Sequence, residues 1–380
     1  MFDTDVLIVG AGPTGLALAT ALAARSIDTM VIDAQSAGAN TSRAAAINAR
    51  TLEVLEDLDV TGRLVKAGLQ LPVFTVRDHE RTLIDIDFSS LPTAYPYTLA
   101  LPQSDTENLL LERLIELGGG VSRPRSLASV TQDGGGVDSL LDDGSSVRAR
   151  YTVGADGMRS LVREQAGIGF GGDEYAESFM LADVRLTGEA PDDRVILFWA
   201  RAGLTVIAPM PGGLHRIVAP MAEAPETPSV GLVQALLDDR GLGSGRTTVT
   251  DLIWGSRFRI HHRVADTYRS GRLLLAGDAA HVHSPAGGQG MNLGIQDAVA
   301  LADALAASLG GSDGLLDAYS ASRRAIAQQV LALTGRLTRL ATMPAAVRPV
   351  RNALIGSAGQ VPFVRHRLAM RLSGLDYRSR

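Results

Sequence analysis

The stretch VLIVGAGPTG, residues 6–15, carries the strongest fold signal in this 380-residue chain. A short apolar run ends at Val9, and Gly10-x-Gly12-x-x-Gly15 then leads into the helix-forming sequence LALATALAA. Gly10 permits a tight turn, Gly12 allows a phosphate to approach the backbone, and Gly15 allows the helix to pack closely on the strand. The free N–H groups of the first helical turn favour an anion. The pattern therefore predicts a strand, a turn and a helix that bind a dinucleotide.

A second apolar run supports this interpretation. The sequence DTMVID ends at Asp33, close to the spacing of about 20 residues at which an acid accepts hydrogen bonds from the ribose hydroxyls. Strand, glycines, helix, strand and acid in this order are much more specific than the glycines alone. Within such a unit, Pro13, Thr14 and Ala34 are also expected to lie beside the ligand.

The composition excludes several other classes of protein. The net charge of -5 gives no basic surface for nucleic acid. The chain has no cysteine, which excludes disulfides, thiolate metal sites and cysteine nucleophiles, and we expect no metal site. Residues 6–24 are uncharged, but glycines and Pro13 interrupt them, and Asp3 and Asp5 stand where a signal peptide would be positive. We therefore expect a cytoplasmic protein without a nucleic-acid or membrane partner.

The remaining chain divides according to its periodicity. We expect a helix at about residues 43–58, where Leu52, Leu55 and Leu58 share one face, two strands within 73–88 and a helix at about 104–117. Between about 171 and 269 the pattern becomes that of antiparallel strands with one helix at about 228–240. From RLLLAGDAAH onward, the pattern again resembles that of the nucleotide-binding part, and helices are expected to the C-terminus. A sheet-rich insertion of this kind suggests a ligand held between two parts of the chain.

Two later motifs narrow the dinucleotide to FAD. They are VGADGMRSLVRE, which begins at Val153, and LLLAGDAAHVHSPAGGQGMNLGIQDA, which begins at Leu273. With the first glycine motif, they make the chain resemble the class A flavoprotein monooxygenases, the aromatic hydroxylases typified by p-hydroxybenzoate hydroxylase. The resemblance covers essentially the whole chain and is strongest to the phenol- and polyketide-hydroxylating branch. Larger members carry a thioredoxin-like domain after the long C-terminal helix, and we expect none here.

The resemblance implies an α/β fold with two intimately connected parts. One is a Rossmann-like FAD-binding domain of the glutathione-reductase type, and the other is an inserted mixed-sheet domain for the substrate. The expected ranges are 1–72, 97–170 and 270–340 for the FAD-binding domain, 73–96 and 171–269 for the substrate domain, and 341–380 for a C-terminal helical segment.

The resemblance also implies roles for individual residues. Asp278, beside Gly277, accepts a hydrogen bond from the ribityl chain, and the helix start after Pro285 faces the pyrimidine edge of the flavin, where reduction places negative charge. Pro285 lies beside the reacting oxygen. The remaining residues expected near FAD are Gly288, Gly290, Met291 and Asn292 at that helix start, Arg43 and Gln103 near the phosphates or ribityl chain, and Leu127 near the adenine.

For Asp156 and Gly157 two interpretations stay open. In the family this motif serves FAD and NAD(P)H together, but Asp156 also stands where a helix N-cap belongs.

The implied reaction consumes NADPH or NADH and molecular oxygen, and it hydroxylates a small aromatic substrate through a flavin C4a-hydroperoxide. A base that deprotonates a phenol would assist, and His215 in the insertion is the first candidate. His261 and His262 come next, while His281 and His283 are expected to shape the loop after Asp278. Trp199, Arg201, Phe258 and Met180 are candidates for the pocket lining, although apolar residues on strands more often belong to the core.

Other readings of the chain are a halogenase, a Baeyer–Villiger or antibiotic-modifying monooxygenase, and a flavin-binding protein without turnover. The two tryptophans, Trp199 and Trp254, do not form the W-x-W-x-I-P motif of halogenases. A flavin scaffold has no need of the geometry implied by the loop before Asn292. The sequence leaves open the choice of NADH or NADPH, and of monomer or homodimer.

Overall fold

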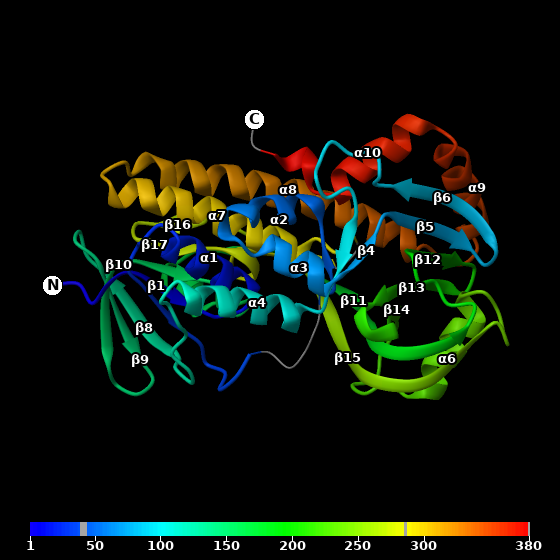
Figure 1. The fold of residues 1–380 in the computed structure, drawn as a ribbon, viewed down its shortest axis with the longest axis horizontal. Helices are drawn as coiled ribbons and strands as arrows, with labels where there is room; N and C mark the ends of the chain where they lie inside the picture. Colours follow the sequence, from blue (N-terminus) through cyan, green and yellow to red (C-terminus); the bar gives the residue numbers. More distant parts are fainter. Residues whose placement is uncertain (39–43, 285–286, 379–380) are drawn as a thin grey trace.

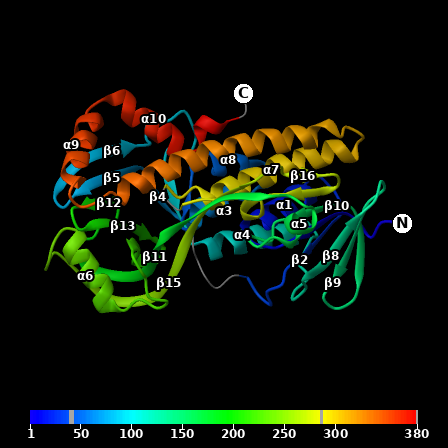
Figure 2. The ribbon, with the colours of Figure 1, turned by 180° about the vertical axis from the view of Figure 1, so that it is seen from behind.

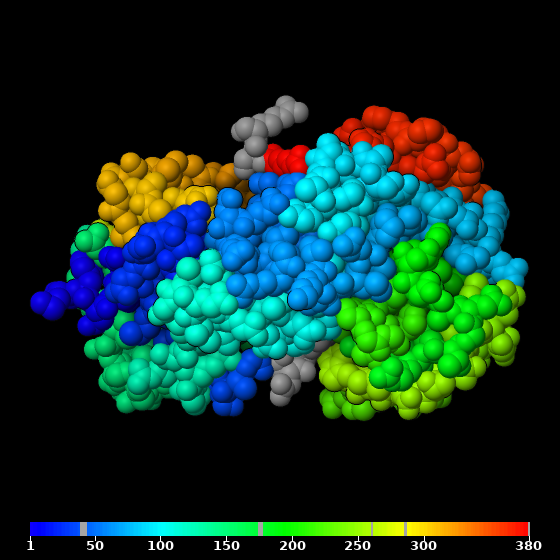
Figure 3. Space-filling view, in the orientation of Figure 1, coloured from blue at the N-terminus to red at the C-terminus, as the bar shows by residue number. Residues whose placement is uncertain are grey.

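The computed structural model describes residues 1–38, 44–284 and 287–378, and it confirms the predicted α/β fold. Two large sheets lie at the two ends of an elongated molecule, and two long helices, α7 (Gly290–Leu309) and α8 (Gly314–Ala341), run along one side (Figure 1). The space between the sheets is covered on the front by segments from the first third of the chain (Figure 3).

The first sheet contains the N-terminal glycine motif. Its main path has the order β16-β17-β10-β1-β2, in which β17, β10, β1 and β2 are parallel, and β9 and β8 extend it from β10 as an antiparallel hairpin. Residues Val6 to Val9 are buried on both faces of this sheet, as the continuous apolar run predicts. The strands are β1 (Thr4–Val9), β2 (Thr29–Ile32), β8 (Leu127–Gln132), β9 (Val137–Leu141), β10 (Ser146–Gly154), β16 (Arg269–Ser270) and β17 (Leu273–Leu275).

The second sheet has eight strands in the order β18-β15-β11-β14-β13-β12-β5-β6 and is mixed, with β5 parallel to β12. Its two longest strands reach from the seven-stranded sheet to α6 (Val230–Arg240) (Figure 2). The strands are β5 (Val73–Asp78), β6 (Arg81–Asp87), β11 (Phe170–Gly188), β12 (Arg194–Ala200), β13 (Gly203–Met210), β14 (Leu214–Met221), β15 (Thr247–Ala265) and β18 (His281–Val282).

The two faces of the eight-stranded sheet have different neighbours. On one face, Ile207 and Ile217 belong to a core cluster that includes Leu237 of α6. On the other face, Met210 packs with Leu71 of a small sheet made of β3 (Ala46–Ile47), β7 (Thr98–Ala100) and β4 (Leu69–Leu71). Because side chains alternate between faces along a strand, the neighbours of any residue on this sheet can be assigned from its position.

The predicted helix at about 43–58 is wrong in its first part. Ala46 and Ile47 form β3 and pair with Ala100 and Leu99, and helix α2 covers only Ala49–Val54, followed by a 3-10 turn at Glu56–Leu58. The apolar spacing was real, because Leu52, Leu55 and Leu58 are buried. Pairing with β7 satisfies the backbone groups of β3, and the side chain of Asn48 caps α2 by accepting from Thr51 N–H.

The other predicted helices form close to their expected positions as α1 (Pro13–Ala23), α4 (Gln103–Glu116), α6 and α7, and the C-terminal segment is helical, with α9 (Arg348–Gly359) and α10 (Pro362–Leu372). Helix α5 (Leu161–Gln165) follows the Asp156 motif, and α3 (Thr61–Ala67) was not predicted. Across the described ranges, none of the helices combines the length and the apolar character that crossing a bilayer requires.

Candidate cofactor and active site

The glycines of the first motif have the three separate geometries that the sequence predicts. Gly10 has a φ of +104°, and a Cβ on it would lie 2.3 Å from the carbonyl oxygen of Ala155. A Cβ on Gly15 would lie 1.9 Å from the carbonyl oxygen of Gly10, so only glycine lets α1 approach β1 this closely. At Gly12, no atom lies within 4 Å of the corresponding position. The middle glycine therefore faces open space, while the outer two are packed.

The start of α1 has no side-chain cap, so its N–H groups can donate to a ligand. Gly12 occupies the N-cap without a side-chain hydrogen bond, Pro13 follows it, and the first turn contains no acidic residue. Asp33, directly after β2, accepts hydrogen bonds from Ala11 N–H (2.7 Å) and from Gln35 N–H (2.8 Å). The predicted ribose-binding acid is thus held against the glycine turn, and Ala34 beside it is exposed.

Arg123 lies at the glycine turn, although no sequence motif points to it. Arg123 directly follows Ser122, whose carbonyl accepts a hydrogen bond from Asp33 N–H. One Nη of Arg123 donates to the carbonyl of Ala11 (3.3 Å), and its buried Nε has no partner among the described residues. It brings a positive charge to the glycine turn. No local motif surrounds it, so only the fold could reveal it.

The second motif lies against the same turn. After β10, the carboxylate of Asp156 accepts from Leu161 N–H (2.8 Å) and Val162 N–H (3.4 Å) at the start of α5. The N-cap residue itself is Ser160, whose Oγ accepts from Arg163 N–H (3.1 Å), so Asp156 supports the helix start from outside the cap position. The other carboxylate oxygen is buried without a partner among the described residues, and burial raises the pKa of Asp156 despite its hydrogen bonds. Gly157 follows with a φ of +78° and an open side.

Arg163, from α5 of this motif, connects it to the third. Its guanidinium donates to the carbonyls of Met158 (2.9 Å) and Ala279 (2.9 Å) and lies 3.9 Å from the ring centre of Phe170. These contacts hold the loop of Asp156 and the loop of Asp278 together.

The third motif packs directly on the first. Gly277 has a φ of +62°, and a Cβ on it would lie 2.4 Å from Thr14 Oγ1. A Cβ on Gly294 of α7 would lie 2.3 Å from the same oxygen. Thr14 is therefore wedged between two glycines instead of projecting into open space. Asp278, next to Gly277, is exposed, as a residue that meets a ligand must be.

The start of α7 is tied to β3 by Asn292. Its side chain accepts from Asn48 N–H (2.8 Å) and donates to the carbonyls of Ala46 (2.8 Å) and Gly288 (2.7 Å). The amide is fully buried, so Asn292 acts on the loop through its side chain and only its backbone remains for a ligand. The helix begins at Gly290 without a side-chain cap or an acidic residue, and Met291 packs against the main core. Pro285 lies outside the described residues.

The remaining predicted cofactor residues are Gln103, Arg43 and Leu127. Gln103 begins α4, its Oε1 accepts from Ala44 N–H (3.3 Å), and its Nε2 donates to Glu107 (2.8 Å). Arg43, one residue earlier than Ala44, is outside the described residues. Leu127 is buried in the core at the start of β8, so its predicted contact with the adenine stays a prediction.

The position of His215 does not support its predicted role as a base. By alternation it shares a face of β14 with Ile217, which packs in the cluster of α6, and it points away from the small sheet and from α7. Its Nε2 donates to the carbonyl of Pro191 (2.7 Å), and burial lowers its pKa. Burial and the hydrogen bond to Pro191 do not favour a catalytic role for His215, and that role stays a prediction.

His283 is the histidine that lies at the start of α7. Its Cε1 is 3.9 Å from the position of a Cβ on Gly290, and its Nδ1 donates to the carbonyl of Ser284 (3.0 Å). Burial, and then the charge of His281, lower the pKa of His283 to about 4, so its ring is neutral at neutral pH. The two rings stack with centres 6.2 Å apart. His261 and His262 lie on β15, where they pair with Glu174 and Asp173 of β11.

The face of the eight-stranded sheet that points away from α6 carries aromatic side chains and an ion pair. Arg216 and Asp183 share this face and form a bidentate pair with N–O distances of 2.8 and 2.7 Å. The Arg216 guanidinium lies 5.9 Å from the ring of Trp254, and Phe179 stacks on Phe258 at 5.5 Å. This face can hold a flat ring system by stacking.

The other proposed lining residues have different neighbours. Met180 belongs to the core cluster of α6, so it is a core residue and not part of a pocket lining. Trp199 packs against Arg351 of α9, and Arg201 accepts at its carbonyl from Arg348. Neither contact points to a pocket near the cofactor motifs.

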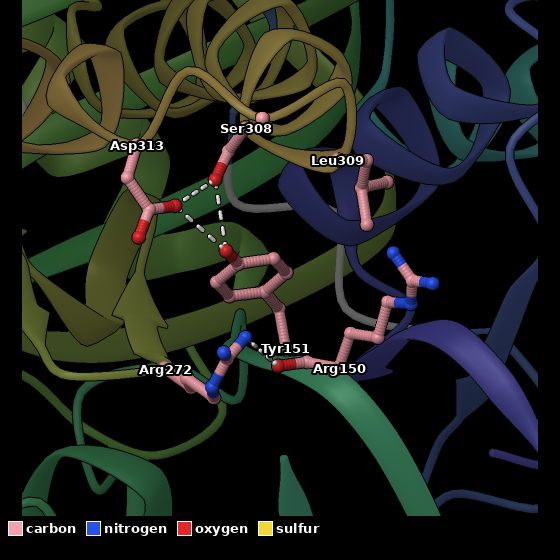
Figure 4. Close-up of a pocket in the computed structure, with 7 residues that line it drawn as sticks. Arg150, Tyr151, Arg272, Ser308, Leu309 and Asp313 are labelled. Atoms are coloured by element: carbon pink, nitrogen blue, oxygen red, sulfur yellow. Dashed lines mark hydrogen bonds between the residues drawn. The ribbon is translucent and has the colours of Figure 1, made fainter. Parts of the chain in front are cut away.

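A separate hollow at the far end of α7 has a different character. It has a volume of about 370 Å³ and is lined by Arg150, Tyr151, Arg272, Ser308, Leu309, Gly311 and Asp313 (Figure 4). Tyr151 OH hydrogen-bonds with Ser308 Oγ (2.8 Å) and donates to Asp313 (3.0 Å). A helix of 20 residues is about 30 Å long, so this hollow is remote from the start of α7. The carbonyl end of the helix also disfavours phosphate there.

The three motifs fit FAD. The segments of the three motifs pack on one another through Thr14 and Ala155. They carry the uncapped starts of α1 and α7, the open Gly12 and the two acids Asp33 and Asp278. The helix starts suit the pyrophosphate and the reduced flavin, and the acids suit ribose and ribityl hydroxyls. In the described parts of the chain, no three His, Asp or Glu side chains are grouped to hold a metal ion.

Comparison with known proteins agrees with this geometry. The family model described as "FAD binding domain" matches residues 3–334. The chain is 41% identical over 358 residues to 6-methylpretetramide 4-monooxygenase of Streptomyces rimosus, an alignment that covers 91% of this chain and 64% of that protein. The chain thus spans about two thirds of the length of that relative.

Two solved structures are similar over nearly the whole chain. The p-nitrophenol 4-monooxygenase of Pseudomonas putida has a TM-score of 0.85 at 27% identity and covers 99% of both chains. A Diels-Alderase of pyrroindomycin biosynthesis has a TM-score of 0.83 at 32% identity and covers 98% of this chain and 80% of its own. The predicted resemblance is confirmed: the chain belongs to the FAD binding domain family, in the group of flavoprotein aromatic monooxygenases, and its cofactor is FAD.

Proposed function

We propose that this chain hydroxylates an aromatic substrate of phenolic or polyketide type, with FAD as cofactor and with NADPH or NADH and dioxygen as co-substrates. The observation that carries the proposal is the wedge of Thr14 between Gly277 and Gly294, because it joins the first and third motifs into one site. By their names, two of the relatives above act on 6-methylpretetramide and on p-nitrophenol.

The ranges expected for the two domains are proposed with their functions. Residues 1–72, 97–170 and 270–340 hold FAD, and residues 73–96 and 171–269 hold the substrate. The strand pairing supports this division, with one exception, since β18 lies in the third FAD range but pairs with β15. The absence of cysteine supports a cytoplasmic location.

Each part of the chain has a distinct task in this mechanism. When bound, FAD would carry reducing equivalents from NADPH or NADH to dioxygen and so activate it. Asp33 and the open Gly12 orient the dinucleotide, Asp278 meets its ribityl chain, and the N–H groups at Gly290 and Met291 stabilise negative charge at the helix start. These roles are proposals that rest on the exposure and the free donors described above.

The aromatic face of the eight-stranded sheet orients the substrate. Phe179, Phe258 and Trp254 offer ring faces for stacking, and the Arg216–Asp183 pair offers one polar anchor. His283 lies at the start of α7, but its lowered pKa makes the ring a weak proton acceptor, so we assign no catalytic base.

The test is oxidation of NADPH and of NADH by the purified protein with FAD, with and without candidate phenols and polycyclic phenols. We expect substrate-stimulated oxidation and transfer of one atom of labelled dioxygen into the product. A protein that binds FAD but never incorporates oxygen overturns the proposal.

A specific observation favours one second function. The Diels-Alderase relative has the same fold over 98% of this chain at 32% identity, so the family also supports a ring-forming reaction that needs no net oxidation. Product formation without NAD(P)H and without dioxygen identifies that case.

A further inference from the structure

Asp297 of α7 holds donors from three separate segments. It is the penultimate residue of the third motif, but no contact with FAD was assigned to it. Its Oδ2 accepts from His281 Nε2–H (2.6 Å) and from Gly277 N–H (3.3 Å). Its Oδ1 accepts from Arg323 Nε–H (2.6 Å) of α8. One carboxylate therefore joins the loop before Asp278, strand β18 and helix α8.

The side chains of Asp297, His281 and Arg323 form a buried, charged cluster. The side chains of Asp297 and His281 are 0% exposed and that of Arg323 is 7% exposed. Burial acts to raise the pKa of Asp297, but the charges of Arg323 and His281 outweigh it, and the pKa lies below the usual value. A buried pair of this kind is a poor source of net stability compared with apolar packing. Its presence is better explained by the geometry that it imposes.

That geometry concerns the loop that carries Asp278. Gly277 has a φ of +62° and is confined on one side by Thr14. On the other side its N–H is held by Asp297, and the loop is further held through Ala279, whose carbonyl accepts from Arg163. Asp278 itself is exposed between these fixed points. Asp297 thus controls the backbone from which the cofactor-facing carboxylate extends.

We propose that Asp297 is a positioning residue for FAD, which holds the Gly277–Asp278 loop in its binding conformation and is itself fixed by Arg323 and His281. The inference rests on FAD binding and not on hydroxylation, so it stands or falls separately from the proposed reaction.

The test uses the full chain freed of FAD and titrated with FAD by fluorescence quenching. Asp297→Asn keeps the size of the side chain but removes its charge and places an N–H₂ group toward one of the three donors. We expect the Kd for FAD to rise by about tenfold or more, and hydrogen exchange at the Gly277 amide of the FAD-free protein to become faster. Leu237→Ala in α6 is the control, since it lowers the melting temperature at a distant core position.

A second pair of variants keeps the test decisive if Asp297→Asn does not fold. His281→Gln retains an N–H donor near the Nε2 position and is expected to keep the Kd within about threefold, whereas His281→Leu removes the donor and weakens FAD binding by about tenfold. A melting temperature that falls as in Leu237→Ala, with an unchanged Kd and unchanged exchange at Gly277, shows a merely structural role and overturns the proposal. So does equal FAD affinity of His281→Gln and His281→Leu.

Discussion

Thr14 Oγ1 fills the space that a methyl group on Gly277 would need, at 2.4 Å from the ideal Cβ position of that glycine. The two residues belong to motifs that are far apart in the chain, at the start of α1 and before β18. Contact between them fixes the relative position of the phosphate-facing helix start and the loop of Asp278. The site is therefore sensitive to single methyl groups, and this sensitivity differs from one glycine to the next.

Gly277→Ala is expected to destabilise the protein and to weaken FAD binding. The added Cβ collides with Thr14 and is strained at a φ of +62°, so the cost is about 2–4 kcal/mol in the free energy of unfolding. Gly144→Ala is the matched control, because its φ is +82° but no atom lies within 4 Å. Urea unfolding with and without FAD measures both. Equal losses in the two variants show that the contact with Thr14 is unimportant.

Gly12→Ala is expected to leave the FAD-free protein intact and to impair FAD binding alone. The residue has a φ of -75° and no neighbours around its Cβ position, so alanine fits the fold without strain. A phosphate that approaches this backbone meets the new methyl group, and we expect a loss in affinity of about tenfold or more. Gly62→Ala in α3, which also has an open side, is the control. An unchanged Kd for FAD contradicts the assignment of the first motif.

Asp183→Asn is expected to destabilise the substrate-binding face. It leaves the guanidinium of Arg216, whose side chain is 4% exposed, without its charged partner, at a cost of about 3 kcal/mol. Asp193→Asn disrupts the exposed pair with Arg194 and is expected to cost less than about 1 kcal/mol. Unfolding experiments compare the two, and substrate titrations of the folded Asp183→Asn protein should show a raised KM with an unchanged Kd for FAD. A raised Kd for FAD contradicts the placement of this pair on the substrate side.

The stability of the protein is expected to fall below pH 6.5 because of His283. The pKa of this buried ring is about 4 in the folded protein, below its ordinary value of 6.5. Between these values the unfolded chain takes up a proton that the folded chain does not, so the free energy of unfolding falls by up to about 1.4 kcal/mol for each pH unit. His283→Asn should flatten this part of the profile, while His366→Asn, at an exposed position, should not. Parallel profiles for all three proteins refute the assignment.

The parts of the fold that local sequence determines were predictable. The glycine motif, the buried parallel strands and the alternation in the insertion each have a pattern of a few residues, and each appears where it was expected. The helix at 43–58 failed at its start because Ala46 and Ile47 pair with β7, and the partner strand lies more than 50 residues away. No local pattern reports such a pairing.

The site was predictable only where a motif describes it. His215 was chosen for its residue type and its place in the insertion, but the face on which it lies depends on the register of β14 against β13. Asp297 and Arg123 were missed because their importance lies in what surrounds them. Asp297 resembles any acid in a helix until Gly277, His281 and Arg323 are seen to converge on it.

The short strand β18 has a mechanical consequence. Gly277 adjoins the seven-stranded sheet through Ala276, whose N–H donates to Gly154, and only four residues later His281 pairs with Val264 in the eight-stranded sheet. So short a segment has almost no slack. A shift of the eight-stranded sheet against the seven-stranded sheet would therefore displace the backbone of Asp278, so the proposed substrate-binding sheet and the proposed ribityl-binding residue are coupled.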